Sequence, residues 1–422
     1  MSVRAQPGMS ETKNGSKLQI LFLSRWFPYP ADNGARIRIL NLLKALGHRY
    51  EVDLVSFFEQ PPTEADMQAL QSICRSVSTA PYTSFDPGRF HILHGLLSAK
   101  PRSLVATQSI ELSSQIRRRV EQHNYDVIIA SEIDMLPYVP AGEIPAVLEE
   151  LELATLFEQY KNAESPVRRL RYGLTWWKLQ RYLARSLQRF AACTVVSEPE
   201  LTRLRGTFPA YEGVTTVIPN GVDVAYYQGT VGEPQPDTMI YSGAITYRAN
   251  YDAVDYFGSE IMPLIRRRRP SAELLVTGKT GDLDIRPLQR PGIRFLGYLP
   301  HVRPAVAQAW LSVIPLRLGG GTRLKMLESL AIGTPVVATA KGAEGLLLQP
   351  GRDFLSATTP DEFADAVVRL LSDGELRAAL SRAGRESVAA YDWTTIGQKL
   401  CALIERVAGS VNSQVPAGGA EP

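Results

Sequence analysis

Residues 312–345 read SVIPLRLGGGTRLKMLESLAIGTPVVATAKGAEG, and this stretch decides the fold class. A short apolar run, 313–316, ends in the glycine-rich turn 319–322, and about ten helix-compatible residues follow it. A stop at 333–335 precedes a second β-branched run, 336–339. Strand, glycine-rich turn, helix and strand joined by short loops are typical of one parallel βαβ unit.

The helix of this unit begins with an unusual pair of charges. Thr322 is a suitable N-cap, and a capping box would place Glu or Gln at position 325, where the chain has Lys325 close to Arg323. Two cations in the first turn oppose the helix dipole, each at a cost of about 0.3–1 kcal/mol. A bound anion would reverse this effect, because the loop amides, the free helix N–H groups and both cations would face it. We therefore expect an anion site; the alternative is a solvent-exposed helix start with incidental charges.

An acidic residue lies next to the expected anion site. Glu328 follows Lys325 by three residues, so both side chains project from the same side of the helix. A carboxylate accepts hydrogen bonds from hydroxyl groups. An anion beside vicinal hydroxyls matches the diphosphate and ribose of a nucleotide, which is the ligand that this stretch predicts.

Length and composition indicate a two-domain enzyme. At 422 residues the chain exceeds one ordinary core, and 45% hydrophobic with 21% charged residues is typical of a soluble globular protein. A net charge of +3 is too small to indicate nucleic-acid binding. Three widely spaced cysteines, Cys74, Cys193 and Cys401, form no disulfide or zinc pattern and fit a reducing compartment.

The expected location is the cytoplasm, with peripheral attachment to the inner face of the plasma membrane as a variant. Residues 1–16 do not resemble a secretory signal, and no run approaches the roughly 18 apolar residues of a spanning helix. The histidines show no helical metal spacing except His91 and His94, so we expect no metal.

The first half opens with a buried strand over 18–23, followed by a loop and a helix. Asn33 and Gly34 form the turn into this helix, and Arg36 lies in its first turn. Loops beyond the carboxyl ends of parallel strands form the ligand crevice of such sheets, so these three residues are site candidates. The alternative for Asn33 and Gly34 is ordinary turn chemistry.

A strand over 51–58 comes next, and another buried strand, 125–130, ends in Ser131, Glu132 and Asp134. The two acids follow a strand's carboxyl end, where chemistry is usually placed, and we expect them to touch substrate; the alternative is a pair of solvated loop acids. A helical pattern over 63–77 lies between the two strands.

Residues 165–190 carry seven Arg or Lys and no acid. On a helical wheel one face is apolar and the opposite face is basic; the two sets are Trp176, Leu179, Leu183, Leu187 and Phe190, and Lys178, Arg181, Arg185 and Arg189. We interpret this segment as a surface helix packed on its own domain. The alternative is a basic surface for anionic lipid or a lipid-linked acceptor.

Several motifs together resemble one family. They are the loop with Asn33 and Gly34, Val195-Val196-Ser197-Glu198, Ile218-Pro219-Asn220-Gly221-Val222-Asp223, Phe295-Leu296-Gly297-Tyr298, Gly319 to Glu328 and Gly333 to Thr339. The chain resembles glycosyltransferase family 4, retaining enzymes with the GT-B fold, and most resembles the branch associated with bacterial exopolysaccharide and exosortase loci. The resemblance implies two Rossmann-like, doubly wound parallel-sheet α/β domains that face each other across a cleft.

The resemblance also implies roles for the site residues. Arg323 and Lys325 would bind the diphosphate of a nucleotide-sugar donor, and Glu328 its ribose. The loop of Gly319, Gly320, Gly321 and Thr322 would lie against the transferred sugar. Asn33, Gly34 and Arg36 would face the cleft from the acceptor side.

The expected domain plan follows from the βα rhythm and the resemblance. It has a disordered N-terminus, an acceptor domain, a linker, a donor domain, a helix that crosses back to the first domain and a disordered tail, at 1–16, 17–228, 229–237, 238–390, 391–409 and 410–422.

The donor side departs from the family pattern at three positions. The family commonly carries a glutamate eight positions before Glu328, where this chain has Gly320. It often has Arg and Lys in the loop after the first donor-domain strand, where Ala244 and Ala249 stand beside Gly243 and Arg248. More of the phosphate charge would then fall on Arg323 and Lys325.

The acceptor side departs from the family pattern as well, because a histidine often stands where this chain offers Ser131, Glu132 and Asp134. We expect a metal-free retaining transfer from a nucleotide-diphosphate sugar to a hydroxyl of a saccharide or lipid-linked acceptor in bacterial cell-surface glycan synthesis. The alternatives are a sugar-nucleotide epimerase on the same architecture and a non-catalytic nucleotide-sugar-binding adaptor.

Overall fold

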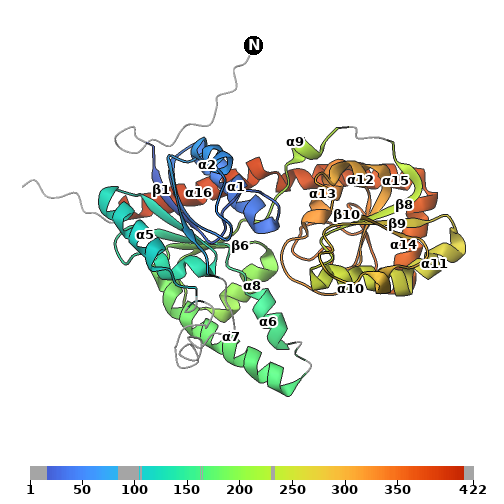
Figure 1. Cartoon of the computed structure of the whole chain (residues 1–422), viewed down its shortest axis with the longest axis horizontal. Helices are drawn as coiled ribbons and strands as arrows, with labels where there is room; N and C mark the ends of the chain where they lie inside the picture. The colour runs from blue at the N-terminus through green and yellow to red at the C-terminus, as the bar shows by residue number, and fades with distance from the viewer. Residues whose placement is uncertain are drawn as a thin grey trace, which may run out of the picture. The chain divides into compact units, whose positions relative to one another are not determined.

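The computed structural model describes residues 17–83, 104, 107–161, 163, 165–229 and 233–412 (Figure 1). The chain divides into two compact units, 219–396 and the remainder, 1–218 with 397–422. Each unit is an α/β domain built on a parallel sheet, which confirms the expected fold class.

The first unit contains seven parallel strands in the order β3-β2-β1-β4-β5-β6-β7. The bounds are β1 Gln19–Ser24, β2 Glu51–Phe58, β3 Ser76–Pro81, β4 Val127–Ser131, β5 Ala146–Glu149, β6 Ala192–Val195 and β7 Val214–Val217. The connections run in opposite directions on the two sides of the β1–β4 pair. This reversal is the topological switch point at which ligands bind in doubly wound sheets.

The helices of the first unit cover this sheet. They are α1 Gly34–Gly47, α2 Glu64–Gln71, α5 Ile110–Gln122, η1 Ile133–Tyr138, α6 Ala154–Lys161, α7 Pro166–Ser186, η2 Leu187–Arg189 and α8 Glu198–Thr207. The helix expected over 63–77 was too long, since α2 ends at Gln71 and β3 occupies its last two positions. The alternation in Ser76-Val77-Ser78-Thr79 has the two-residue period of a strand.

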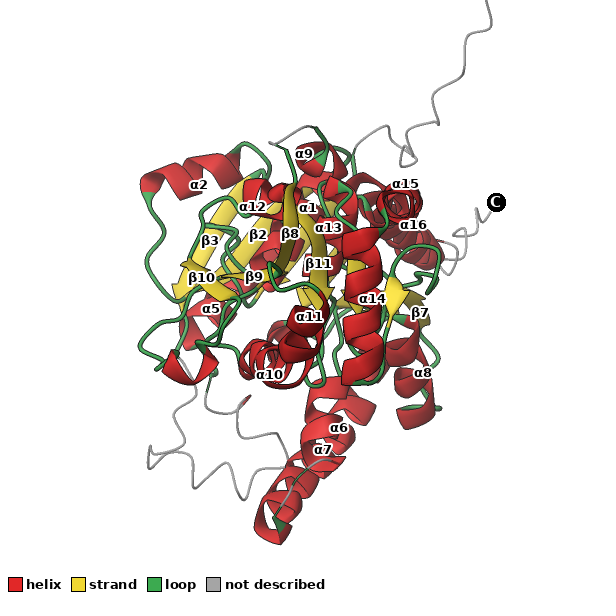
Figure 2. Ribbon diagram, turned by 90° about the vertical axis from the view of Figure 1, so that its right-hand side faces the viewer, coloured by secondary structure: helices red, strands yellow, loops and turns green. Residues whose placement is uncertain are grey.

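The second unit repeats the same plan with six parallel strands in the order β10-β9-β8-β11-β12-β13. Figure 2 labels four of them, β10, β9, β8 and β11. Its strands are β8 Gln235–Ser242, β9 Glu273–Thr277, β10 Ile293–Gly297, β11 Ala309–Ile314, β12 Val336–Ala338 and β13 Leu355–Ser356. The helices are α9 Val224–Tyr227, α10 Arg248–Tyr256, η3 Phe257–Ile261, α11 Met262–Arg268, η4 Arg286–Leu288, α12 Arg303–Gln308, α13 Leu324–Ile332, α14 Pro360–Ser372, α15 Gly374–Val388 and η5 Ala389–Tyr391. Here the order reverses between β8 and β11, and that pair is the second switch point.

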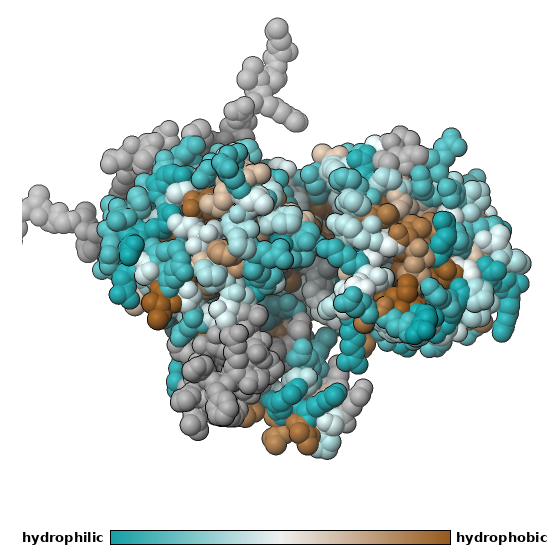
Figure 3. Space-filling view, in the orientation of Figure 1, coloured by the Kyte–Doolittle hydropathy of each residue, from teal (hydrophilic) through white to brown (hydrophobic). Residues whose placement is uncertain are grey.

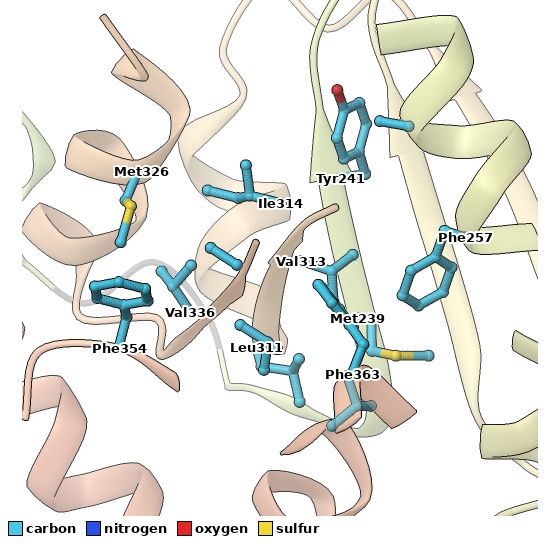
Figure 4. Close-up of a cluster of buried hydrophobic side chains, with 14 of the residues drawn as sticks. Met239, Tyr241, Phe257, Leu311, Val313, Ile314, Met326, Val336, Phe354 and Phe363 are labelled. Carbon is cyan, nitrogen blue, oxygen red and sulfur yellow. The ribbon is translucent and has the colours of Figure 1, made fainter. Parts of the chain in front are cut away.

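A buried apolar cluster fixes the switch point of the second unit. Figure 4 shows Met239 and Val313 from the central strands between Phe257 and Met326 of the covering helices. Tyr241 places its ring in this cluster, and its hydroxyl group points away from the other labelled side chains. Burial of such side chains stabilises the fold by roughly 1.5–3 kcal/mol each, so the core holds the polar end of Tyr241 in place.

The boundary between the units differs from the expected linker. It falls between Ile218 and Pro219, and β8 already begins at Gln235, inside the expected linker 229–237. The last helix, α16 Trp393–Asn412, belongs to the first unit from Gly397 onward and continues past the expected start of the disordered tail at 410. Residues 1–16 and 413–422 lie outside the described residues.

Candidate functional site

The donor-side candidates gather at the switch point of the second unit. The glycine-rich turn follows β11, and Gly243 follows β8, so both lie at the carboxyl edge of the sheet. A Cβ atom on Gly243 would lie 2.8 Å from Lys325 Nζ, which shows how closely the two loops approach. The structure therefore brings two of the donor-side candidates, Gly243 and Lys325, close together.

Lys325 is the best-defined group of this cluster. Its ammonium donates hydrogen bonds of 2.8 Å to the hydroxyl of Tyr241 and of 2.8 Å to Oδ1 of Asn250, and it lies 4.0 Å from the centre of the Tyr241 ring. Burial and the nearby charge of Arg323 lower the pKa of Lys325 to about 7, against a smaller opposite effect of Glu328. A positive charge that the protein alone stabilises poorly would gain from an anion at this point.

Arg323 has a different place from the one expected. Its guanidinium is 5% exposed and donates to the carbonyls of Gly319, Gly320 and Lys341 at 2.7–2.9 Å. It also contacts Glu344 at 3.3 Å. Arg323 thus fixes the glycine-rich turn, and it acts on Lys325 through its charge.

The helix start also differs from the expectation for Thr322. α13 begins at Leu324, its N-cap position is Arg323, and no side chain caps it. The Thr322 hydroxyl instead accepts a hydrogen bond of 3.0 Å from Nδ2 of Asn220. The reason is the set of carbonyl contacts made by Arg323, which pulls the turn away from the capping geometry.

Glu328 faces a tyrosine that the sequence did not indicate. The hydroxyl of Tyr227 donates to Oε1 of Glu328 at 3.1 Å, and α9 carries this tyrosine four residues after Asp223. Burial raises the pKa of Glu328, while the Tyr227 hydrogen bond and Lys325 act in the opposite direction. Residues 219–227 therefore contact both ends of the candidate site, through Asn220 and Tyr227.

The glycines of the turn adopt conformations that other residues rarely take. Gly319 and Gly321 have φ angles of 97° and 77°, in the left-handed region. A Cβ on Gly319 would lie 3.0 Å from that of Ala249. Arg248, in contrast, is exposed at the start of α10, and Asn250 of the same helix makes the contact with Lys325.

In the first unit, Asn33 and Gly34 shape the start of α1. Asn33 is the N-cap, and its side chain accepts from the backbone N–H of Arg36 at 3.0 Å, while Gly34 is the first helical residue. The Arg36 guanidinium lies 3.1 Å from Asp32 and 3.8 Å from Glu59. Turn chemistry thus accounts for Asn33 and Gly34, and Arg36 is held in an acidic environment.

A second arginine next to this loop was not foreseen. Arg25 directly follows β1, is 6% exposed and donates to Glu59 at 2.9 Å. Its guanidinium lies 3.1 Å from the ring centre of Tyr82 and 4.2 Å from that of Trp26. Its NH1 atom is buried without a hydrogen-bond partner among the described residues. The one sequence signal for Arg25 as a site residue is its position directly after a buried strand.

Glu132 and Asp134 lie at the carboxyl end of β4, as expected. Glu132 directly follows the strand with a φ angle of 68°, and Asp134 lies in η1. Burial raises the pKa of both carboxyl groups, and Glu150 raises that of Glu132 further. Among the described residues, no recorded contact joins Glu132 or Asp134 to Asn33 or Gly34.

The basic segment 165–190 forms α7 and η2 and buries the predicted apolar face. Trp176, Leu179 and Leu183 are buried, as are Leu187 and Phe190. The sequence predicted a basic face opposite the buried one. The first turns of α7 instead expose four apolar side chains on that face: Val167, Leu170, Leu174 and Trp177, which are 78%, 77%, 47% and 50% exposed. Figure 3 shows hydrophobic residues at the lower tip of the chain, where α7 begins. The helix is therefore apolar on two sides.

Within the part of the chain that the structure describes, no three His, Cys, Asp or Glu residues are grouped as ligands of a metal ion. The pair His91 and His94 lies outside the described residues. None of the helices described is both long and apolar enough to span a bilayer. Cys74, Cys193 and Cys401 are buried free thiols.

Two family models match the chain, one in each half. Residues 32–226 match "Glycosyltransferase Family 4", and residues 236–373 match "Glycosyl transferases group 1". The second match contains the turn and helix with Lys325 and Glu328, and the first contains Asn33, Glu132 and α7.

Curated proteins of similar sequence include mannosyltransferases. A phosphatidyl-myo-inositol mannosyltransferase of Mycobacterium tuberculosis is 29% identical over 213 residues, which is 46% of this chain and 54% of that protein. The chain thus spans about half the length of this relative. An uncharacterized 44.6 kDa protein in the cps region of Klebsiella pneumoniae is 19% identical over 83% of this chain and 90% of that protein.

Solved structures share the fold over nearly the whole chain. Sucrose-phosphate synthase from Thermosynechococcus elongatus superimposes with a TM-score of 0.64 at 17% identity, covering 93% of this chain and 100% of that one. Anabaena Alr3699/HepE, solved in complex with UDP and glucose, gives a TM-score of 0.59 at 16% identity and covers 92% and 100%. At these identities the similarity establishes the GT-B fold alone.

Proposed function

We propose that this chain, a glycosyltransferase that carries a family 4 domain and a group 1 domain, transfers a sugar from a nucleotide-diphosphate sugar to a hydroxyl acceptor. The reaction retains the anomeric configuration and serves the synthesis of bacterial exopolysaccharide or another cell-surface glycan. The relative in a cps region supports this setting, as does the sequence resemblance to the exopolysaccharide branch.

The observation that carries the proposal is the position of Lys325 at the β8–β11 switch point. Its ammonium is partly buried, has a lowered pKa and is held by Tyr241 and Asn250. A nucleotide diphosphate offers the charge that such a group needs. The carboxylate of Glu328, one helical turn further, suits the ribose hydroxyls.

In this proposal Lys325 stabilises the diphosphate as it leaves, with Arg323 adding charge from behind the turn. Removal of one preorganised donor of this kind costs about 10²–10³ in rate in other enzymes. The reaction needs no metal if these two cations balance the leaving group. Gly320 leaves the turn without a carboxylate for a covalent intermediate, which favours attack on the same face of the sugar that the diphosphate leaves.

The acceptor meets the first unit at its β1–β4 switch point. Glu132 and Asp134 receive the acceptor hydroxyl there, and Arg36 orients the remainder of the acceptor. Asn33 and Gly34 contribute by fixing the start of α1 and hence the position of Arg36.

The exposed side of α7 fits an anionic membrane surface, the setting of a lipid-linked acceptor. Four apolar side chains at 167, 170, 174 and 177 share one side of the helix, and Lys178, Arg181 and Arg185 continue that side. Residues 165–190 contain no acid. Apolar insertion next to cations is the pattern of helices that lie in a bilayer interface.

Vesicle sedimentation tests this membrane contact. The chain should sediment with phosphatidylglycerol-containing vesicles and less with phosphatidylcholine alone, and high salt should reduce binding. Leu170→Ser with Trp177→Ser should abolish binding, whereas the control Ile110→Ser, which changes a 90% exposed apolar residue of α5, should not. Equal binding of both variants, or self-association through α7 in place of vesicle binding, would contradict the proposal.

A panel of sugar nucleotides tests the transfer itself. A tight donor stabilises the folded state by about 2.7 kcal/mol at 100 times its dissociation constant, so thermal shifts identify the nucleotide and sugar. Product analysis then follows with and without saccharide and lipid-linked acceptors. Acceptor-dependent release of nucleoside diphosphate, unchanged by EDTA, supports the proposal. A changed sugar nucleotide without acceptor indicates an epimerase, and binding without turnover indicates an adaptor.

A further inference from the structure

We propose that Tyr227 is a positioning residue of the donor site. Its hydroxyl group holds the carboxylate of Glu328 in the orientation that receives the two ribose hydroxyls of the nucleotide. This inference rests on the proposed function and deepens it, because it identifies the donor as a ribonucleotide that is recognised by a carboxylate oriented before the ligand arrives.

The contact joins two elements of the second unit that are distant in the sequence. α9 lies beside α13 (Figure 1), and the hydroxyl of Tyr227 donates a hydrogen bond of 3.1 Å to Oε1 of Glu328. Among the described residues, Tyr227 is the one hydrogen-bond donor recorded for this carboxylate. A carboxylate can accept about four hydrogen bonds, and Glu328 is partly exposed, so its second oxygen stays available to a ligand.

The backbone around Tyr227 is fixed on both sides by one arginine. Arg303, the first residue of α12, donates to the carbonyl of Tyr226 at 2.5 Å and to that of Gln228 at 3.1 Å. The start of α9 is capped by Asp223, whose side chain accepts from the backbone N–H of Tyr226 at 2.8 Å. These contacts hold Tyr227 between two anchored neighbours.

The ring of Tyr227 is fixed as well. It packs against two buried apolar clusters of the second unit. The ring of Tyr226 lies edge-on to it, with 4.9 Å between the ring centres and 86° between the ring planes. Packing therefore sets the direction in which the hydroxyl of Tyr227 points, and the carboxylate of Glu328 follows it.

A carboxylate that is held in this way binds a ligand at a lower entropic cost. A ligand that must itself order a flexible side chain loses a factor of about 3–10 in affinity. Glu328 avoids this loss because Tyr227 has already ordered it. Burial raises the pKa of Glu328, and the hydrogen bond from Tyr227 acts against this effect, so it favours the ionised form. An ionised carboxylate only accepts hydrogen bonds, as donating ribose hydroxyls require.

A tyrosine whose hydroxyl served the fold alone would change stability and leave ligand affinity unaltered. Tyr227→Phe removes the hydroxyl and keeps the ring that packs against the clusters. Tyr226→Phe is the matched control, since it makes the same change one residue earlier in α9, where the hydroxyl lies 3.4 Å from Nδ1 of His301. Melting temperatures of both variants show whether the fold is intact.

Calorimetry with three probes tests the orientation of Glu328. The probes are the tightest binder among UDP, GDP and ADP, its 2′,3′-dideoxy form, which lacks both ribose hydroxyls, and pyrophosphate. Tyr227→Phe should weaken binding of the ribonucleotide about 3–10-fold and leave binding of the other two probes unchanged. Tyr226→Phe should bind all three probes as the wild type does. In the transfer assay of Tyr227→Phe, the KM of the donor should rise by the same factor with little change in kcat.

A double-mutant cycle with Glu328→Ala separates the hydrogen bond from other effects of the substitution. In the Glu328→Ala background, Tyr227→Phe should cause no further loss of ribonucleotide affinity, because the carboxylate that the tyrosine orders is gone. An equal loss in both backgrounds would show that Tyr227 acts independently of Glu328, and it would overturn the inference.

The remaining outcomes distinguish failure of the inference from failure of the proposed function. If the wild type binds none of the three nucleoside diphosphates, the proposed function is refuted, and the inference with it. Binding with the same preference for the ribonucleotide over its dideoxy form in wild type and Tyr227→Phe would refute the inference alone. Tighter ribonucleotide binding by Tyr227→Phe would show that the tyrosine competes with the ribose for Glu328, which also overturns it.

Discussion

Nucleotide binding should be coupled to proton uptake at Lys325. Burial and Arg323 lower the pKa of this ammonium to about 7 in the unliganded chain. A diphosphate in contact with it should return the pKa at least to the ordinary value of 10.5. Lys325→Met keeps the length and apolar character of the side chain and removes the titrating group.

The size of the effect follows from these two values. At pH 8 about one-tenth of the free protein carries the proton, so binding takes up about 0.9 proton; the uptake is about 0.5 at pH 7. The affinity should fall about tenfold, or about 1.4 kcal/mol, for each pH unit between 7 and 10. The terminal phosphate ionises near pH 6, so measurements at pH 8 avoid its contribution.

Isothermal titration calorimetry in buffers of different ionisation enthalpy measures the proton uptake directly. The wild type should show the predicted uptake, and Lys325→Met should show almost none together with much weaker binding. The unliganded wild type should also gain stability as the pH rises from 7 to 10, because its unfolded state binds the extra proton, and the variant should lack this rise. Equal proton uptake in wild type and Lys325→Met would refute the assignment of Lys325 to the diphosphate.

Three further substitutions test other parts of the structure. Glu328→Gln should weaken nucleoside diphosphate binding roughly 10–100-fold but leave pyrophosphate binding unchanged, as calorimetry can show; equal losses would remove the ribose role. Glu149→Gln breaks the buried pair with Arg38 and should cost about 3–5 kcal/mol in urea unfolding, and a loss under 1 kcal/mol would contradict this. Gly333→Ala should lower the free energy of unfolding by more than about 1 kcal/mol, because φ is 89° and the new Cβ would lie 2.3 Å from Arg385. An unchanged unfolding midpoint would show that the backbone and the Arg385 side chain adjust without cost.

The fold could be predicted because its strands are short apolar runs bounded by turn residues. The run 313–316, the glycine-rich turn and the second run 336–339 gave the βαβ unit that the structure contains. β5 escaped prediction because a run of four residues is too short to show a period. The domain boundary at Ile218 was not predicted either. Composition identifies loops rich in Gly and Pro, whereas a domain boundary is set by which residues contact each other in the fold.

The candidate site could be predicted at Lys325 and Glu328 because their spacing on one helix is visible in the sequence. Their partners could not, since Tyr241 and Tyr227 lie 84 and 101 positions away and only the fold joins them. The expected cap at Thr322 failed for the same reason: Arg323 competes for the turn through carbonyl contacts that no local pattern reveals.

The acceptor side was predicted in part. Glu132 could be named because it follows a buried strand, but its place next to β5 depends on the strand order and its positive φ angle on the folded chain. In α7 the wheel identified the buried face correctly. The exposed apolar residues at its start were missed, because a wheel assigns one apolar face to a helix and this helix has two.

Hydrogen–deuterium exchange of the whole chain, with and without the nucleoside diphosphate found by the panel, tests the central claim most directly. Binding should slow exchange at residues 319–328 and 241–250, because the ligand covers the glycine-rich turn and the start of α13, and Lys325→Met should lose this protection. Protection centred elsewhere in the chain, or equal protection in the variant, would contradict a donor diphosphate site at Lys325.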